Sequence, residues 1–354
     1  MMLDSKSVLE VLRPVQDPEL QKSLVELNMI RNVVVDGGQV SFTLVLTTPS
    51  CPLREFIVED CQTAVKTLPG VENVEVEVTA ETPQQKTLPD RTSVPGIKNI
   101  IAISSGKGGV GKSSVAANVA VALAAKGSKV GLLDADIYGP NAPNMFGLSD
   151  AKIAVKQDSN GDILEPAFNH GVKLVSMAFL IDPDQPVIWR GPMLNGIIRQ
   201  FLYQVEWGEL DYLIVDMPPG TGDAQLTMAQ AVPMAGAVIV TTPQTVSLID
   251  ARRGLKMFQQ LGVNLLGIVE NMSYFIPPDM PDKSYDLFGS GGGERTAKEL
   301  DIPLLGCVPL EIALREGGDN GTPIVVAAPE SASAKALVAI SEQIAAKVSI
   351  AAFA

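Results

Sequence analysis

The sequence contains few cysteines, few aromatic residues and no long apolar run. Only three of its 354 residues are cysteine and one is histidine, and 5% are aromatic. Three cysteines cannot form the disulfide framework of a secreted domain, so we expect a reduced, cytoplasmic protein. The sequence has no uninterrupted run of about 18 apolar residues, so we predict no transmembrane helix. The first residues, with Asp4 and no apolar stretch behind it, predict no signal peptide.

A cluster of basic residues is also missing. The net charge is −13, and Lys and Arg are scattered, so a general attraction to nucleic acid or anionic lipid is not expected. The expected last helix, 333–354, carries Lys335 and Lys347 against Glu342. This is too little charge for stable binding to a membrane surface. We therefore expect neither nucleic acid nor membrane among the partners.

What the chain does contain is typical of an α/β protein: 46% hydrophobic residues and 31 glycines. Residues 83–96 are rich in proline and polar residues, and we interpret them as a linker between residues 1–82 and 97–354. Residues 1–82 predict a small α+β domain. Its expected elements are helices at 5–13 and 53–67, a hairpin turning at Asp36-Gly37-Gly38 and a strand in 71–78.

After the linker, short and continuously apolar runs alternate with expected helices. Runs of this kind form strands buried on both faces, so they predict a doubly wound, mainly parallel sheet whose functional loops follow the carboxyl ends of the strands. The runs lie at 99–104, 129–136, 211–220, 235–243 and 264–272.

The stretch "SSGKGGVGKSS" (104–114) contains the phosphate-binding pattern G-x-x-x-x-G-K-[ST], between a predicted strand and a predicted helix. Its backbone N–H groups are expected to bind phosphate oxygens. Lys112 is expected to lie along the β- and γ-phosphates, and Ser113 to bind Mg²⁺. The nucleotide-binding residues predicted here are Gly106, Lys107, Gly108, Gly109, Val110, Gly111, Lys112, Ser113 and Ser114.

Three aspartates lie at the ends of two predicted strands: Asp134 and Asp136 in "LLDAD", and Asp216 in "LIVDMPPGTGD". Each could be a helix cap. Beside a phosphate loop they also suit Mg²⁺, which binds through one or two carboxylates together with phosphate and water. Their position at the mouth of one sheet favours the metal and catalytic roles.

The motifs "GKGGVGKSS", "DADIYGPN", "WRGPM", "DMPPGTGD" and "ENMSYF" closely resemble those of the Mrp/ApbC family of iron–sulfur cluster carrier ATPases. These belong to the P-loop class with a deviant Walker A motif, together with septum-placement and partition ATPases. The resemblance covers about residues 97–345, and residues 1–82 resemble the small iron–sulfur-assembly domain often fused in front. The resemblance to the Mrp/ApbC family implies an ATP-hydrolysing homodimer that transfers iron–sulfur clusters to apoproteins.

The resemblance also implies roles for single residues. Lys107 would reach into the nucleotide site of the partner subunit, Asp136 would position the attacking water, and Asp134 and Asp216 would hold Mg²⁺. Asn271 would recognise the adenine edge, and Arg190 would be a cation of a switch region. His170 has no motif around it, and we expect it at the surface.

The chain departs from the family at the cluster motif. The family usually has Cys-Pro-x-Cys just after "NMSYFI", but Pro277 and Met280 stand in the place of the two thiols, so the usual site, expected to hold a four-iron cluster, is absent. Cys51 before a predicted helix and Cys307 in "LLGCVPL" are the possible ligands or transfer thiols. Packing is the slightly favoured role for Cys307, and Cys61 is expected in the core.

Two other functions stay open at this point. A nucleotide-switched ATPase that positions a partner would need no cluster. An ATP-driven reductase would need cysteine ligands inside the ATPase domain, yet no cysteine lies between residues 62 and 306. We therefore discount the reductase and keep the cluster carrier as the preferred hypothesis.

Overall fold

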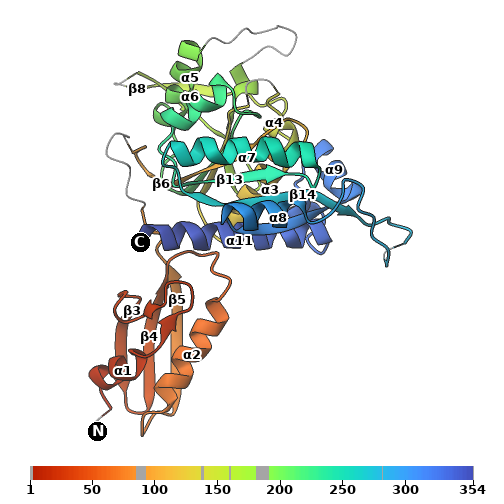
Figure 1. The fold of residues 1–354 in the computed structure, drawn as a ribbon. Coiled ribbons are helices and arrows are strands. Elements are labelled where there is room, and N and C mark those ends of the chain that lie inside the picture. Colours follow the sequence, from red (N-terminus) through yellow and green to blue (C-terminus); the bar gives the residue numbers. More distant parts are fainter. Residues whose placement is uncertain are drawn as a thin grey trace. The chain divides into compact units, whose positions relative to one another are not determined.

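The computed structural model describes residues 3–84, 93–136, 139–158, 161–180, 191–280 and 282–353. The chain divides into two compact units, one of residues 1–84 with 345–354 and one of residues 85–344 (Figure 1). Most of the predicted linker lies outside the described residues. The domain limits 1–82, 83–96 and 97–354 stay predictions.

The small unit is a three-stranded sheet with two helices packed together on it. Strands β3 and β4 form the predicted hairpin, and β5 lies parallel to β4. One face of the sheet and both helices share a core of buried apolar side chains that includes Phe42, Leu44 and Ile57. Its elements are α1 (Ser5–Leu12), β1 (Gln16–Asp17), β2 (Lys22–Ser23), β3 (Ile30–Asp36), β4 (Gln39–Leu46), α2 (Arg54–Lys66) and β5 (Asn73–Ala80).

The large unit is built on an eight-stranded sheet in the order β10-β11-β7-β12-β6-β13-β14-β15. All neighbouring pairs are parallel except β10 and β11. The predicted doubly wound, mainly parallel sheet is therefore confirmed. The strands are β6 (Ile97–Ser105), β7 (Val130–Asp134), β10 (Ala167–Asn169), β11 (Val172–Ser176), β12 (Leu210–Asp216), β13 (Gly236–Thr241), β14 (Leu265–Phe275) and β15 (Leu304–Leu310), with a separate hairpin of β8 (Ala154–Asp158) and β9 (Gly161–Glu165).

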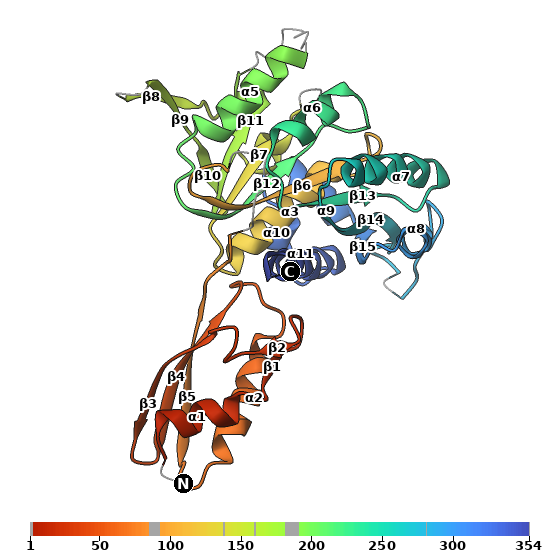
Figure 2. The ribbon, with the colours of Figure 1, turned by 60° about the vertical axis from the view of Figure 1, so that its left-hand side comes forward.

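Helices cover both faces of this sheet (Figure 2). Helix α3 packs on the central strands from one face, and α7 and α8 pack on β13, β14 and β15 from the other. The middle residues of the central strands, 100–103 in β6 and 213–215 in β12, are apolar because both faces of the sheet are covered. The helices are α3 (Lys112–Ala125), α4 (Ala142–Met145), η1 (Met177–Leu180), α5 (Gly191–Tyr203), α6 (Asp223–Ala231), α7 (Thr245–Gln260), α8 (Gly292–Leu300), α9 (Ile312–Asp319), α10 (Ile324–Ala327) and α11 (Ala332–Phe353).

Helix α11 is long and apolar enough, by length and composition, to cross a membrane. Such composition is also typical of a helix packed in a core, and the part of α11 up to Ile344 packs in this way. Leu337, Ile340 and Ile344 are buried, and Gln343 Nε2 donates to Leu305 O on β15 over 2.9 Å. The apolar composition of this part is therefore explained by packing within the large unit.

Candidate functional site

The loop of residues 106–111 joins the central strand β6 to the first residue of α3, Lys112. Gly111 is the N-cap of α3 and has a φ of 81°, a conformation that favours glycine. A Cβ on Gly111 would lie 2.2 Å from Asn271 Nδ2, and one on Gly106 would lie 2.1 Å from the carbonyl carbon of Asp250. The positive φ and the neighbouring Asn271 side chain therefore require glycine at position 111, and the close approach of the Asp250 backbone requires it at position 106.

Lys112 lies between two carboxylates below this loop. Its Nζ is 2.6 Å from Asp216 Oδ1 and 3.4 Å from Asp136 Oδ2, and the lysine is only 6% exposed. Burial works against the charged ammonium, but attraction to Asp216 and Asp136 outweighs it and raises the pKa of Lys112. The lysine is thus held as a cation in the place where a phosphate loop needs one.

Asp134 is completely buried at the end of β7, and its oxygens accept three hydrogen bonds. The donors are Asp136 N at 3.3 Å, Ala142 N at 3.0 Å and Ser176 Oγ at 2.9 Å. Burial, and then repulsion by Asp216, raises its pKa to about 7. Asp134 therefore helps to fix the backbone just after β7, where Asp136 lies.

Asp216 ends β12, beside Asp134 in the register of the two strands. Its Oδ1 accepts from Lys112, whereas its buried Oδ2 has no hydrogen-bond partner among the described residues. Burial raises the pKa of Asp216 although Lys112 opposes the shift. Burying a carboxylate oxygen without a hydrogen-bond partner costs folding free energy. This oxygen suits a hydrated cation, and Ser113 Oγ lies close by, 3.4 Å from Lys112 Nζ.

A cavity of about 380 Å³ opens over the loop. It brings together many of the residues predicted for nucleotide binding and catalysis. They are Lys107, Gly108, Gly109, Gly111, Lys112, Ser113, Ser114 and Asp136. Val110 is buried with 2% exposure, and Gly106, Asp134 and Asp216 are not part of this lining. Of these two aspartates, Asp216 contacts the cavity residue Lys112, and Asp134 accepts from the backbone N–H of the cavity residue Asp136.

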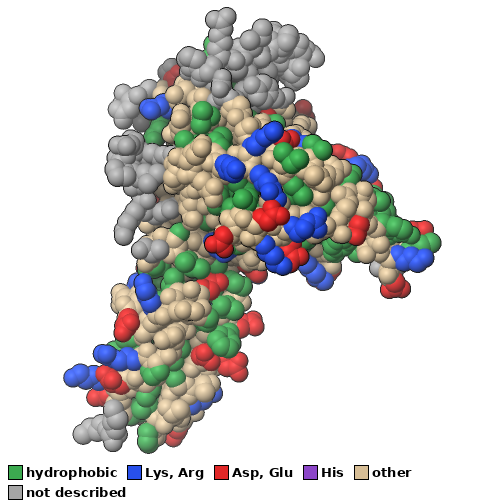
Figure 3. Space-filling view, in the orientation of Figure 1, with side chains coloured by type: hydrophobic (Ala, Val, Ile, Leu, Met, Phe, Trp, Pro, Cys, Tyr) green, Lys and Arg blue, Asp and Glu red, His purple; other side chains and the backbone are tan. Residues whose placement is uncertain are grey.

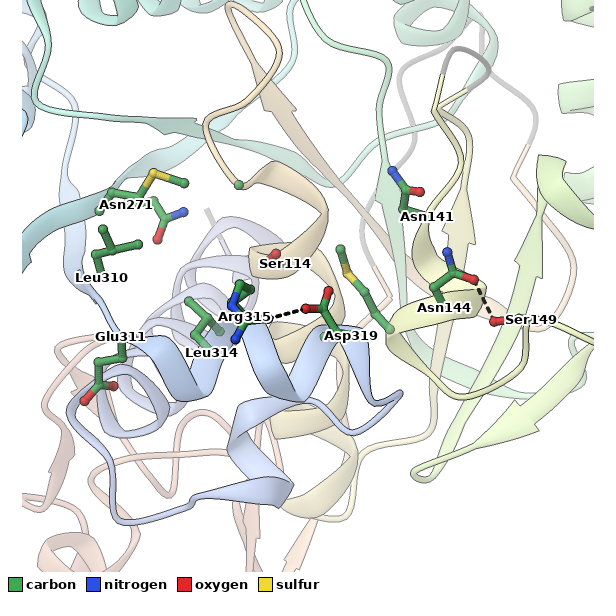
Figure 4. Close-up of a pocket in the computed structure, with 14 residues that line it drawn as sticks. Ser114, Asn141, Asn144, Ser149, Asn271, Leu310, Glu311, Leu314, Arg315 and Asp319 are labelled. Carbon is green, nitrogen blue, oxygen red and sulfur yellow. Dashed lines mark hydrogen bonds and ion pairs between the residues drawn. The ribbon is translucent and has the colours of Figure 1, made fainter. Parts of the chain in front are cut away.

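A second cavity of about 460 Å³ adjoins the first and shares Gly111, Ser114, Asn141 and Met145 with it. Asn271 lies at one end (Figure 4). Its Nδ2 donates to Val110 O over 2.8 Å, and its buried Oδ1 has no partner among the described residues. The amide is thereby oriented with its acceptor free.

The walls of this second cavity contain residues that the sequence motifs did not single out. In Figure 4, α9 supplies Leu314, Arg315 and Asp319, and the opposite side supplies Asn144 and Ser149. Arg315 and Asp319 form an ion pair of 2.6 Å one helical turn apart. This i,i+4 spacing is the only sequence signal that could have linked them.

The three cysteines lie in different environments. Cys61 is completely buried in the core of the small unit, as predicted, and burial raises the pKa of its thiol to about 12. Cys51 is half-buried, three residues before α2. Cys307 is exposed in the middle of β15, which does not fit the packing role favoured for it, and its Sγ lies 3.8 Å from Glu270 Oε1. Burial is the main cause of a raised pKa at Cys307.

The remaining predicted positions lie away from the two cavities or outside the described residues. Pro277 and Met280 lie in the segment after β14, where Met280 is 43% exposed. Arg190 lies outside the described residues. His170, expected at the surface, is half-buried, and its Nε2 lies 3.0 Å from Gly321 O. The surface assignment of His170 is wrong because its turn packs against two other loops.

On the face that Figure 3 shows, cations and carboxylates alternate over α7 and α8. Arg253 pairs with Asp250 at 2.9 Å and Lys298 with Glu294 at 2.8 Å, and Arg252 pairs with Glu299. These pairs reduce the net field of the two helices.

Comparison with known proteins agrees with this geometry. Residues 96–345 match the family model described as the NUBPL iron-transfer P-loop NTPase, and residues 5–78 match that of an iron–sulfur cluster assembly protein. The chain is 80% identical to the iron–sulfur cluster carrier protein of Synechocystis sp. over 99% of both chains. It is 46% identical to the protein of that name from Deinococcus radiodurans, over 97% of this chain and 95% of the other.

Two solved structures are similar to the large unit. A nucleotide-binding protein from Archaeoglobus fulgidus in complex with ADP has 41% identity and a TM-score of 0.57, covering 64% of this chain and 88% of its own. The cell division ATPase MinD of Pyrococcus furiosus has 25% identity and a TM-score of 0.51, covering 70% and 98%. The family match spans most of the chain, and the chain therefore belongs to the NUBPL iron-transfer P-loop NTPase family.

Proposed function

We propose that this protein is a cytoplasmic, homodimeric ATPase that binds iron–sulfur clusters and transfers them to apoproteins. One observation carries the proposal: a phosphate loop with a buried Lys112–Asp216 pair belongs to a chain whose two parts match iron-transfer and iron–sulfur-assembly families. Its curated relatives are named iron–sulfur cluster carrier proteins.

ATP would bind across the two adjoining cavities. The amides of the loop and the N-terminus of α3 would bind the phosphates, and Lys112 would oppose their charge. The base and ribose would occupy the second cavity. There the free Oδ1 of Asn271 can accept from the amino group of adenine, which guanine lacks at that ring position.

Asp136 is the residue that we assign to water positioning. Its side chain is 11% exposed and lines the phosphate cavity, and Lys112 lies 3.4 Å away. A carboxylate at this position can accept a hydrogen bond from the attacking water and so hold it near the γ-phosphate.

Lys107 is assigned to the partner's nucleotide. It is half-buried on the rim of the same cavity, and its carbonyl accepts from Ser105 Oγ over 2.9 Å, which fixes the backbone of the loop. A cation supplied across a dimer interface would stabilise the phosphate charge that develops during transfer, as an arginine finger does.

For Mg²⁺ the fit is best at Ser113 and Asp216, because Asp216 Oδ2 is a buried acceptor without a partner among the described residues. Asp134 supports this site from behind, since its oxygens already accept three hydrogen bonds. When bound, Mg²⁺ would neutralise charge on the β- and γ-phosphate oxygens.

The cluster is the cargo, and Cys51 is the thiol that we assign to it. Cys61 is excluded by its complete burial, and Pro277 and Met280 supply no thiolate. The exposed Cys307 is the second candidate. A four-iron cluster takes four thiolates, whereas Cys51 alone supplies two in a two-fold dimer, so we assign Cys51 the role of a transfer thiol.

Anaerobic reconstitution with iron and sulfide tests the cluster part of the proposal. We expect cluster absorption in the visible spectrum and a whole number of clusters per dimer, followed by transfer to an apo-ferredoxin. A protein that hydrolyses ATP but gives no cluster absorption would contradict it.

That negative result would favour the second candidate function, a nucleotide-switched ATPase that positions a partner without a cluster. The replacement of both thiols of the family motif by Pro277 and Met280 is the observation in its favour. ATP-dependent dimerisation is expected in both cases, so only the metal content separates them.

A further inference from the structure

The tight turn between β10 and β11 brings together the two walls of the second cavity. Asn169 pairs with Val172, so the turn consists of His170 and Gly171. Their φ angles are 49° and 77°, the positive values of a two-residue hairpin turn of the primed type. Histidine accepts this conformation better than most residues. The turn therefore fixes the backbone of His170 and limits the positions that its imidazole ring can take.

On one side the turn is fixed to the end of α4. Asn169 Nδ2 donates to Phe146 O over 2.7 Å, and the ring centroids of Phe146 and His170 are 6.0 Å apart. Phe146 is completely buried and directly follows Asn144 and Met145, which line the cavity. The turn thus holds the α4 wall.

On the other side the turn is fixed to the loop after α9. His170 Nε2 lies 3.0 Å from Gly321 O. A carbonyl only accepts, so Nε2 carries the proton and donates. Gly321 comes two residues after Asp319, which lines the cavity with Gly318. The turn thus holds the α9 wall as well.

The two walls also touch each other beneath the turn. A Cβ on Gly321 would lie 2.4 Å from Gly147 Cα, and both glycines have positive φ, 73° and 65°. The backbones at Gly147 and Gly321 are therefore in close contact. The distance between the two walls stays constant as long as the two loops keep this contact. The hydrogen bonds from Asn169 and His170 hold them there.

We propose that Asn169 and His170 form a clasp that sets the width of the nucleoside cavity, and that His170 is a positioning residue for ATP binding. His170 is not among the residues that line the cavity, so it acts through the α4 and α9 walls. The inference rests on the proposed placement of the nucleoside in this cavity. It assigns the chain's one histidine to nucleotide affinity and leaves the chemistry to the phosphate loop.

The test compares two substitutions at one position. His170→Asn keeps a residue that favours the turn, but its amide is too short to reach Gly321 O. His170→Gln places an N–H near the position of Nε2. We expect His170→Asn to weaken ATP binding about threefold to tenfold, the worth of one hydrogen bond, with kcat unchanged and with parental affinity for inorganic tripolyphosphate. His170→Gln should restore most of the ATP affinity.

Phe168→Ala is the matched control, because Phe168 lies in the same hairpin with 65% exposure. It should bind ATP like the parent. Parental ATP affinity in His170→Asn, or an equal loss for ATP and tripolyphosphate, would overturn the clasp.

Asn271→Ala separates this inference from the proposed nucleoside site. If it weakens ATP but not tripolyphosphate while His170→Asn changes nothing, the clasp alone is wrong. If Asn271→Ala leaves the affinity for ATP unchanged, the placement of the nucleoside is wrong, and the clasp falls with it.

Discussion

Lys112 Nζ donates to Asp216 Oδ1 over 2.6 Å, and neither side chain is more than 6% exposed. The pair joins the first residue of α3 to the last residue of β12 and therefore aligns the phosphate loop with the neighbouring strand end. A buried ion pair that loses one partner leaves an unpaired charge, which is strongly destabilising. Phosphate binding and the integrity of the strand ends thus depend on one lysine.

Lys112→Ala should abolish ATP hydrolysis, with turnover at least about 10²-fold below the parent, because the phosphates lose their main cation. Steady-state phosphate release and ATP binding would measure this. Lys98→Ala is the matched control: Lys98 on β6 pairs at 2.8 Å with Asp211, which lies near the other end of the strand that Asp216 ends. Near-normal turnover in Lys112→Ala would refute the site.

Asp136→Asn should bind ATP with an affinity close to that of the parent but turn it over about 10² to 10⁴ times more slowly, as loss of a residue that acts on the attacking water predicts. Binding measured by equilibrium titration and single-turnover hydrolysis separate the two effects. A variant that no longer binds ATP would mean that the roles of Asp136 and Asp216 are assigned the wrong way round.

Lys107→Ala should retain most of its ATP affinity, because the loop amides and Lys112 remain. Turnover and ATP-dependent dimerisation should fall together, and a cation supplied in trans can be worth about 10³ to 10⁵ in rate. Light scattering with ATP present and a turnover assay measure both quantities. Monomers throughout with unchanged turnover would rule out the contribution in trans.

Cys51→Ser should lower the cluster content, or the rate of transfer to a recipient, while ATP hydrolysis stays near the parental rate. The reason is that the thiol lies in the small unit and the nucleotide cavities in the large one. Iron and sulfide analysis with a transfer assay gives the answer. Unchanged content and transfer would move the assignment to Cys307, for which Cys307→Ser is the next variant.

Cys61→Ser is the control for this series. Its thiol is completely buried, so a hydroxyl without a partner should cost about 1–3 kcal/mol of stability and leave the metal content unchanged. Thermal unfolding of the isolated variant measures the loss.

The phosphate loop was predictable because its chemistry is local. Gly111 takes the positive φ of the turn from a strand into a helix and Lys112 begins that helix, so the pattern lies in adjacent residues. The apolar runs likewise predicted the parallel sheet, since short apolar runs that alternate with helices are typical of strands buried on both faces. The bulk of the fold and the phosphate part of the site therefore follow from short stretches of sequence.

The nucleoside cavity and the environment of single side chains depended on the tertiary structure. Arg315, Asn144 and His170 lie far apart in the chain and carry no shared pattern, yet loop packing brings them to one cavity or beside it. Asn271 is oriented by a carbonyl of the phosphate loop, and Cys307 is exposed because its strand lies at the sheet edge. Local chemistry thus determined the loop and the strands, whereas long-range packing decided the width of the cavity, the role of the one histidine and which thiols solvent can reach.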